Sequence, residues 1–131
     1  MSDQLTTTLG LEIVSASADE VVVEWIVGPQ HHQPMGIVHG GVYCSAIETA
    51  CSIGASMAAS ARDADKVAVG LENHTSFIRA VRSGRLRALA RPITRGRTTQ
   101  VWEADVRDEQ QRVIATGRVR LLVVGRDAAI G

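Results

Sequence analysis

One acidic residue, Glu48, interrupts a long run of small and apolar residues and is the first candidate for chemistry in this sequence. From Gly40 to Ala61 it is the only formally charged residue. An ionised carboxylate in apolar surroundings is costly unless it is paired, hydrogen-bonded or protonated. A carboxylate kept there can act as a nucleophile or a general base. The alternative is an acid that pairs with an arginine or emerges at the edge of a sheet.

Residues at helical spacing surround this acid. On a helix, Cys44, Glu48 and Ser52 share one face, so a hydroxyl lies one turn from the carboxylate. Gly40 and Gly41 stand where the helix would begin, and the free N–H groups there attract a substrate oxygen. A Gly-Gly pair alone is more often only a helix start. Gly40 and Glu48 would be about 12 Å apart, so one substrate touches both only if the helix starts late or bends.

The segment that carries Glu48 is predicted to be a buried helix. The segment 40–61 lacks proline and has one interior glycine, Gly54, so it predicts a helix that is hydrophobic nearly all round. A transmembrane helix is less favoured, because several hydroxyl side chains dilute the hydropathy and Glu48 lies near the middle. The segment therefore indicates the core helix of a soluble protein.

Strand patterns flank this helix. The segment 21–27 has a strand pattern, in which Val21, Val23, Trp25 and Val27 alternate with Val22, Glu24 and Ile26, and Gly28-Pro29 ends it. Four further β-type segments follow the helix, at 67–80, 85–94, 98–107 and 112–124, with turn-like breaks between them. Strands without intervening helices imply an antiparallel sheet. The predicted fold class is α+β, with an antiparallel sheet wrapped around one long central helix in a single domain, residues 1–131.

The composition excludes several classes of function. Fourteen basic residues balance fourteen acidic ones, so no net field favours nucleic acid or a membrane surface. Only 3% of the residues are aromatic, which is too few to stack the bases of a single-stranded nucleic acid. The N-terminus lacks the basic start and apolar core of a signal peptide, so we expect a cytoplasmic protein.

Neither a metal nor a cofactor is expected. His31 and His32 are adjacent in a predicted solvated loop, without a Cys or an acid at ligand spacing. The chain also lacks a P-loop and a dinucleotide fingerprint. Cys44 and Cys51 would be two helical turns apart, too far for a disulfide, so both are predicted to be reduced thiols.

Three stretches carry a family resemblance. QPMGIVHGGVYCSAIETACS, residues 33–52, resembles the signature of the hotdog-fold acyl-CoA thioesterases, in the branch of the phenylacetyl-CoA and 4-hydroxybenzoyl-CoA enzymes. Its specific part is Gln-Pro, then His-Gly-Gly, then a Glu nine residues after the His. VGLENHTSFIRAVRSG, residues 69–84, resembles the strand after the helix, and residues 96–123 resemble the closing hairpin. The resemblance therefore covers nearly the whole chain.

The resemblance implies roles for five residues. Glu48 would attack the thioester carbonyl or serve as general base for water. The Gly40 N–H would polarise that carbonyl, while Gln33 and His39 would position the thioester group. Ser52 would orient the attacking water.

Further substrate contacts are expected from Gly41, His74, Arg79 and Arg82. The two arginines are candidates for binding coenzyme A phosphates through charge-assisted hydrogen bonds. His74 stands where relatives commonly show Asn, and Ala80 where they commonly show Pro. A sheet histidine that is merely hydrogen-bonded is an equal alternative for His74.

The predicted function is hydrolysis of an acyl-CoA thioester with an aromatic or medium-chain acyl group to free acid and CoA. The resemblance implies a homodimer, paired into a homotetramer, with each site between two subunits. One alternative is a hotdog hydratase or dehydratase acting on acyl thioesters. Another is an acyl-CoA-binding module without turnover.

Overall fold

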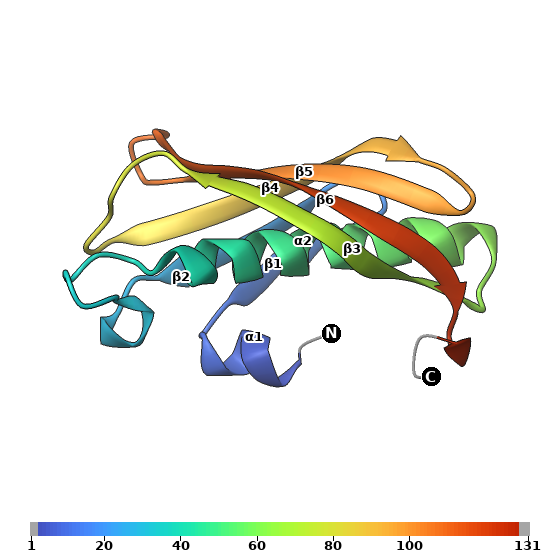
Figure 1. The fold of residues 1–131 in the computed structure, drawn as a ribbon, viewed down its shortest axis with the longest axis horizontal. Helices are drawn as coiled ribbons and strands as arrows, with labels where there is room; N and C mark the ends of the chain where they lie inside the picture. The colour runs from blue at the N-terminus through green and yellow to red at the C-terminus, as the bar shows by residue number, and fades with distance from the viewer. Residues whose placement is uncertain (1–2, 129–131) are drawn as a thin grey trace.

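One long helix lies against a six-stranded sheet in the computed structural model, which describes residues 3–128 (Figure 1). The helices and strands are, in chain order, α1 (Gln4–Thr8), β1 (Glu12–Ala16), β2 (Val21–Ile26), the 3₁₀ turn η1 (Pro29–His31), α2 (Gly40–Arg62), β3 (Lys66–Phe77), β4 (Arg85–Arg95), β5 (Thr99–Arg107) and β6 (Val113–Gly125).

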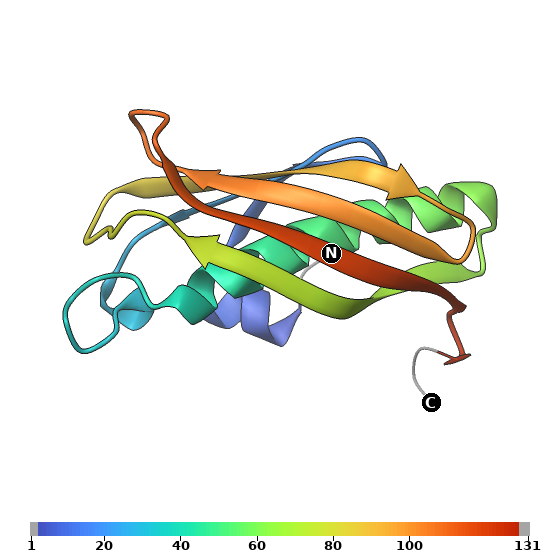
Figure 2. The same cartoon turned by 45° about the horizontal axis from the view of Figure 1, so that its top comes forward.

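The sheet has the strand order β1-β2-β4-β5-β6-β3, and every neighbouring pair is antiparallel. The strands cross over one side of α2, as the two views in Figures 1 and 2 show. β1 and β3 are the edge strands. The antiparallel sheet wrapped around a central helix, predicted from the sequence, is confirmed.

The helix α2 spans Gly40–Arg62, one residue longer than the predicted segment. Its small and apolar side chains pack into the core, including Ala46, Ile47 and Ala50, each 0% exposed. None of the helices in residues 3–128 combines the length and the hydropathy needed to span a membrane. The predicted core helix is therefore confirmed.

A tryptophan packs directly on the backbone of α2 at its interior glycine. A Cβ atom added to Gly54 would lie 2.4 Å from ring atoms of Trp102, which is fully buried. The indole N–H of Trp102 donates to Oε1 of Gln100 at 2.8 Å. Nε2 of Gln100 donates to the Ala55 carbonyl oxygen at 3.0 Å. These bonds hold the indole over Gly54, so the ring cannot move aside.

This packing predicts the sign of a stability change. On an exposed helix, replacing Gly by Ala stabilises by about 1 kcal/mol. We expect Gly54→Ala instead to lower the free energy of unfolding by about 1–3 kcal/mol, because overpacking against a fixed ring outweighs helix propensity. Urea unfolding of both proteins measures this difference. An increase in stability would show that Trp102 does not press on the helix.

The residues before the core helix differ most from the sequence-based expectation. Neither α1 nor β1 was predicted, and β3 ends at Phe77 rather than at residue 80. The prediction of a solvated loop is wrong for His31, which is only 1% exposed. Its Nδ1 accepts from the Gly28 N–H at 2.9 Å, and its Nε2 donates to the Leu9 carbonyl at 2.7 Å. His31 therefore ties the N-terminal segment to the loop, while His32 is exposed.

Candidate active site

The carboxylate of Glu48 lies half-buried on α2, close to the edge strand β3. The Ser52 hydroxyl donates to Oε2 at 3.0 Å, which confirms the predicted contact one turn away. Nδ2 of Asn73 donates to Oε1 at 3.1 Å. Within residues 3–128 no basic side chain forms an ion pair with Glu48. The two carboxylate oxygens are therefore held by neutral donors, and the arginine-paired alternative does not apply within the chain.

The N-terminus of α2 presents a free backbone donor. His39 caps the helix, because its Nδ1 accepts from the Gly41 N–H at 2.7 Å, which leaves the ring proton on Nε2. Within residues 3–128 the Gly40 N–H has no hydrogen-bond acceptor. The ring of Phe77 covers Gly40 closely, since an added Cβ would lie 2.5 Å from two of its atoms. A thioester carbonyl oxygen fits such an N–H at a helix start.

The loop before α2 orients Gln33. Its Oε1 accepts from the Met35 N–H, so its Nε2 is the end left to donate to a substrate. Nη1 of Arg82 donates to the carbonyl oxygens of Met35, at 3.1 Å, and Gly36, at 3.4 Å. Arg82 thus fixes this loop, and its contact with coenzyme A phosphate stays a prediction.

A β-bulge determines which residues of β3 face the helix. The pairing of β3 with β6 shifts register between Gly70 and Glu72, so Leu71 is an extra residue. After the bulge, Asn73 reaches α2 and the neighbouring His74 is exposed on the other face. Asn73 was therefore missed by sequence reasoning, because strand alternation carries no sign of a bulge. Substrate binding by His74, and by the exposed Arg79 that follows β3, stays a prediction.

Two other groups in the core are unsuited to proton transfer at neutral pH. Burial raises the pKa of Tyr43 to about 12, so its hydroxyl stays protonated. Burial, with a smaller effect from Glu48, also raises the pKa of the Cys51 thiol. Because thiolate is the reactive form of cysteine, Cys51 is not a nucleophile here. Neither group therefore replaces Glu48 as the candidate reacting group of the predicted site.

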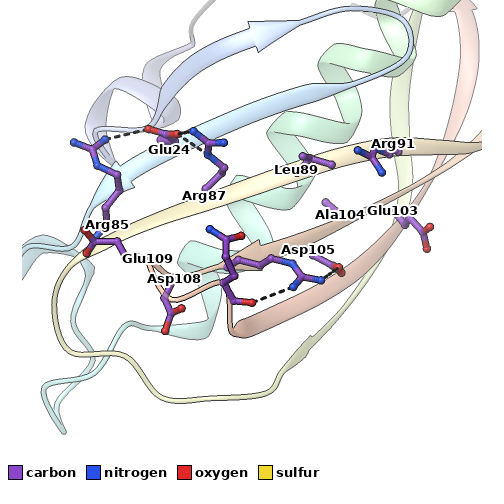
Figure 3. Close-up of a pocket in the computed structure, with 12 residues that line it drawn as sticks. Glu24, Arg85, Arg87, Leu89, Arg91, Glu103, Ala104, Asp105, Asp108 and Glu109 are labelled. Atoms are coloured by element: carbon purple, nitrogen blue, oxygen red, sulfur yellow. Dashed lines mark hydrogen bonds and ion pairs between the residues drawn. The ribbon is translucent and has the colours of Figure 1, made fainter.

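A cleft of about 650 Å³ lies on the outer face of the sheet, and none of its lining residues belongs to the predicted site. Figure 3 shows Glu24 between Arg85 and Arg87, with which it forms ion pairs. Alternate residues of β4, such as Leu86 and Ala88, point instead into the core. The cleft is thus separated from Glu48 by the sheet.

Comparisons with known proteins identify the family of this chain. The family model of the thioesterase superfamily matches residues 35–115. The 1,4-dihydroxy-2-naphthoyl-CoA hydrolase of Listeria monocytogenes is 36% identical over 119 residues, covering 91% of this chain and 94% of that protein. The proofreading thioesterase EntH of Cronobacter turicensis is 35% identical over 121 residues, 92% of this chain and 86% of that protein.

A solved structure has the same fold. Thioesterase HI1161 from Haemophilus influenzae superposes with a TM-score of 0.87 at 34% identity, covering 95% of this chain and 85% of that chain. Its match includes the sheet and the central helix that carry the candidate site. The chain therefore belongs to the thioesterase superfamily, and it is a thioester hydrolase with the hotdog fold.

Proposed function

We propose that this chain hydrolyses acyl-CoA thioesters with aromatic or medium-chain acyl groups, with Glu48 as the catalytic carboxylate. The observation that carries the proposal is a helix carboxylate without an ion-pair partner in residues 3–128, held by Ser52 and Asn73. Hydrolysis of a CoA thioester is named for the relative from Listeria monocytogenes, which supports this class of substrate.

Two routes fit the carboxylate. As a nucleophile, Glu48 attacks the carbonyl carbon, the C–S bond breaks, and water then hydrolyses the acyl-enzyme anhydride. As a general base, it takes a proton from water while the oxygen attacks, and the proton passes to the leaving thiolate. In both routes the Gly40 N–H stabilises the oxyanion, while Gln33 and His39 position the thioester group. Ser52 orients the water in the second route.

A complete site requires a second copy of the chain. Because α2 begins at Gly40 without a break before Glu48, the two groups are about 12 Å apart along one helix. A single carbonyl group cannot contact both at that separation. The Gly40 N–H of one subunit therefore serves the Glu48 of its partner. We propose that this homodimer pairs further into a homotetramer.

The edge strand β3 supports this arrangement. Its side chains Leu71 and Phe77 are 47% and 56% exposed, unusually high for large apolar residues. Gly70 lies against the Glu48 carboxylate and Phe77 lies against Gly40, at the two ends of this strand segment. Antiparallel pairing of β3 with its copy, centred between Asn73 and His74, brings these ends together. Each Glu48 then lies opposite the partner's Gly40.

If Gly40 is a backbone donor to the substrate, substituting it should reduce activity more than it reduces stability. We expect Gly40→Val to lower kcat/KM by about tenfold or more, because the new side chain displaces Phe77 and obstructs the backbone donor. The fold of each chain should change little, since Phe77 is exposed within the single chain, on the edge that is proposed to pair with the partner. Thiol-release assays and thermal melts separate the two effects. Equal proportional losses of activity and of folded protein would mean that Gly40 serves only to start the helix.

Product analysis distinguishes the proposal from its alternatives. The purified protein is incubated with a panel of aromatic and aliphatic acyl-CoAs, and the products are identified by mass spectrometry. Hydrolysis yields equimolar free acid and CoA from at least one thioester. A hydratase or dehydratase would change the acyl mass by one water and leave the thioester intact. A binding module would retain the acyl-CoA unchanged.

A further inference from the structure

The bulge in β3 brings an asparagine to the catalytic acid. Before the bulge, Gly70 faces α2 so closely that an added Cβ would lie 2.4 Å from Oε2 of Glu48. After Leu71, the residues that face the helix are Asn73 and Thr75. Without the extra residue, alternation from Gly70 would turn Glu72 and His74 toward the acid. The bulge thus replaces a charged or titratable neighbour with a neutral amide.

The Asn73 amide is fully engaged in hydrogen bonds. Nδ2 donates to Oε1 of Glu48 and to the Cys44 carbonyl oxygen, both at 3.1 Å. Oδ1 accepts from the Thr75 hydroxyl at 2.6 Å. The hydroxyl and the helix carbonyl together determine which end of the amide faces the carboxylate. Asn73 can therefore only donate to Glu48, and Oε1 of Glu48 is the acceptor.

We infer that Asn73 is a positioning residue, which holds the Glu48 carboxylate in one orientation for attack on the thioester or on water. This inference rests on the proposed function. Asn73 holds Oε1 while Ser52 holds Oε2, so the carboxylate cannot rotate freely about its terminal bond. Gly70 leaves the space that this orientation needs. A misplaced catalytic group costs rate even when its substrate still binds, and orientation can account for a factor of about 10².

The kinetic test uses variants of β3 with acyl-CoA as the substrate. Asn73→Leu has a similar size without donors, and we expect kcat to fall about 10- to 100-fold with KM within about threefold. Thr75→Val should cause a smaller loss of about 3- to 10-fold, since it only releases the amide. Ser76→Ala, at an exposed position of the same strand, is the matched control and should stay within about twofold.

A second test needs no turnover. Asn73→Asp places two carboxylates within hydrogen-bond distance, so we expect Tm to fall by about 3–6 °C. In the Glu48→Gln background, the new carboxylate can accept a hydrogen bond from the new amide, so the fall should be clearly smaller. The part that remains reflects the Cys44 carbonyl oxygen, which loses its donor in both backgrounds. An equal fall in both backgrounds would overturn the contact, whatever the activity of the variants.

The outcomes separate this inference from the proposed function. An active wild-type protein together with a kcat of Asn73→Leu within twofold of it overturns the inference alone. A wild-type protein that hydrolyses no acyl-CoA in the panel overturns both. A kcat loss at unchanged KM, with the background-dependent Tm change, supports the positioning role. A loss of kcat that merely parallels loss of folded protein counts against it.

Discussion

A mixture of two inactive variants should recover about a quarter of the wild-type activity per chain. One variant is Glu48→Gln, and the other is the double variant Gln33→Ala with Gly40→Val. Each homodimer lacks one half of both sites. A mixed dimer combines an intact Glu48 from one chain with the intact Gln33 and Gly40 of the other. Half of the dimers in a random equal mixture are mixed, and each has one intact site of two, which gives about a quarter.

Mixing requires subunit exchange, so the variants are unfolded and refolded together, and native mass spectrometry quantifies the mixed dimers. Thiol release is then measured for the mixture and for each parent treated in the same way. Recovery should follow the fraction of mixed dimers. If mixtures that contain mixed dimers remain as inactive as their parents, each site is built within one chain. The pairing of Gly40 with the partner's Glu48 would then be wrong.

The sequence predicted the helix and the sheet because their signals are local and repetitive. A 22-residue segment with one charge predicts a buried helix, and the strands after it are separated by clear turn residues. By contrast, α1 and β1 carry weak periodicity. They are fixed by long-range contacts, such as the His31 ring bonded to the Leu9 carbonyl. A tertiary contact of this kind leaves no periodic trace in the chain.

The candidate site was predictable where residues lie on one element. Glu48 and Ser52 share a helix face at a spacing that the sequence states directly, and the structure brings them to 3.0 Å. Asn73 was not predictable, because one extra residue at the β3 bulge reverses which side chains face the helix. His74 was selected instead, although it lies on the opposite face. The family resemblance implied a site between two subunits, and the helix start at Gly40 supports that proposal because it keeps Gly40 and Glu48 of one chain apart.

The single substitution Glu48→Gln should lower kcat by at least about 10²-fold. An amide cannot attack the carbonyl as an anion or accept a proton from water, so both possible routes lose their reacting group. The fold should persist, because the amide keeps the size of the carboxylate and its oxygen can still accept from Ser52 or Asn73. Circular dichroism and thermal melting check this expectation.

A matched control separates the effect of changing Glu48 itself from the effect of losing one negative charge anywhere in the protein. Glu103 lies on the outer face of the sheet, exposed and at the rim of the cleft shown in Figure 3. Glu103→Gln makes the same chemical change away from α2. We expect its kcat to remain within about twofold of wild type. A similar loss in both variants would point to a general electrostatic effect.

The central claim is that Glu48 performs thioester hydrolysis, and kcat for one acyl-CoA tests it most directly. Free thiol release is followed at saturating substrate for wild type, Glu48→Gln and Glu103→Gln, with every protein shown to be folded. The account predicts turnover by wild type and by Glu103→Gln, and a loss of at least about 10²-fold in Glu48→Gln. Near-equal turnover by wild type and Glu48→Gln would contradict it.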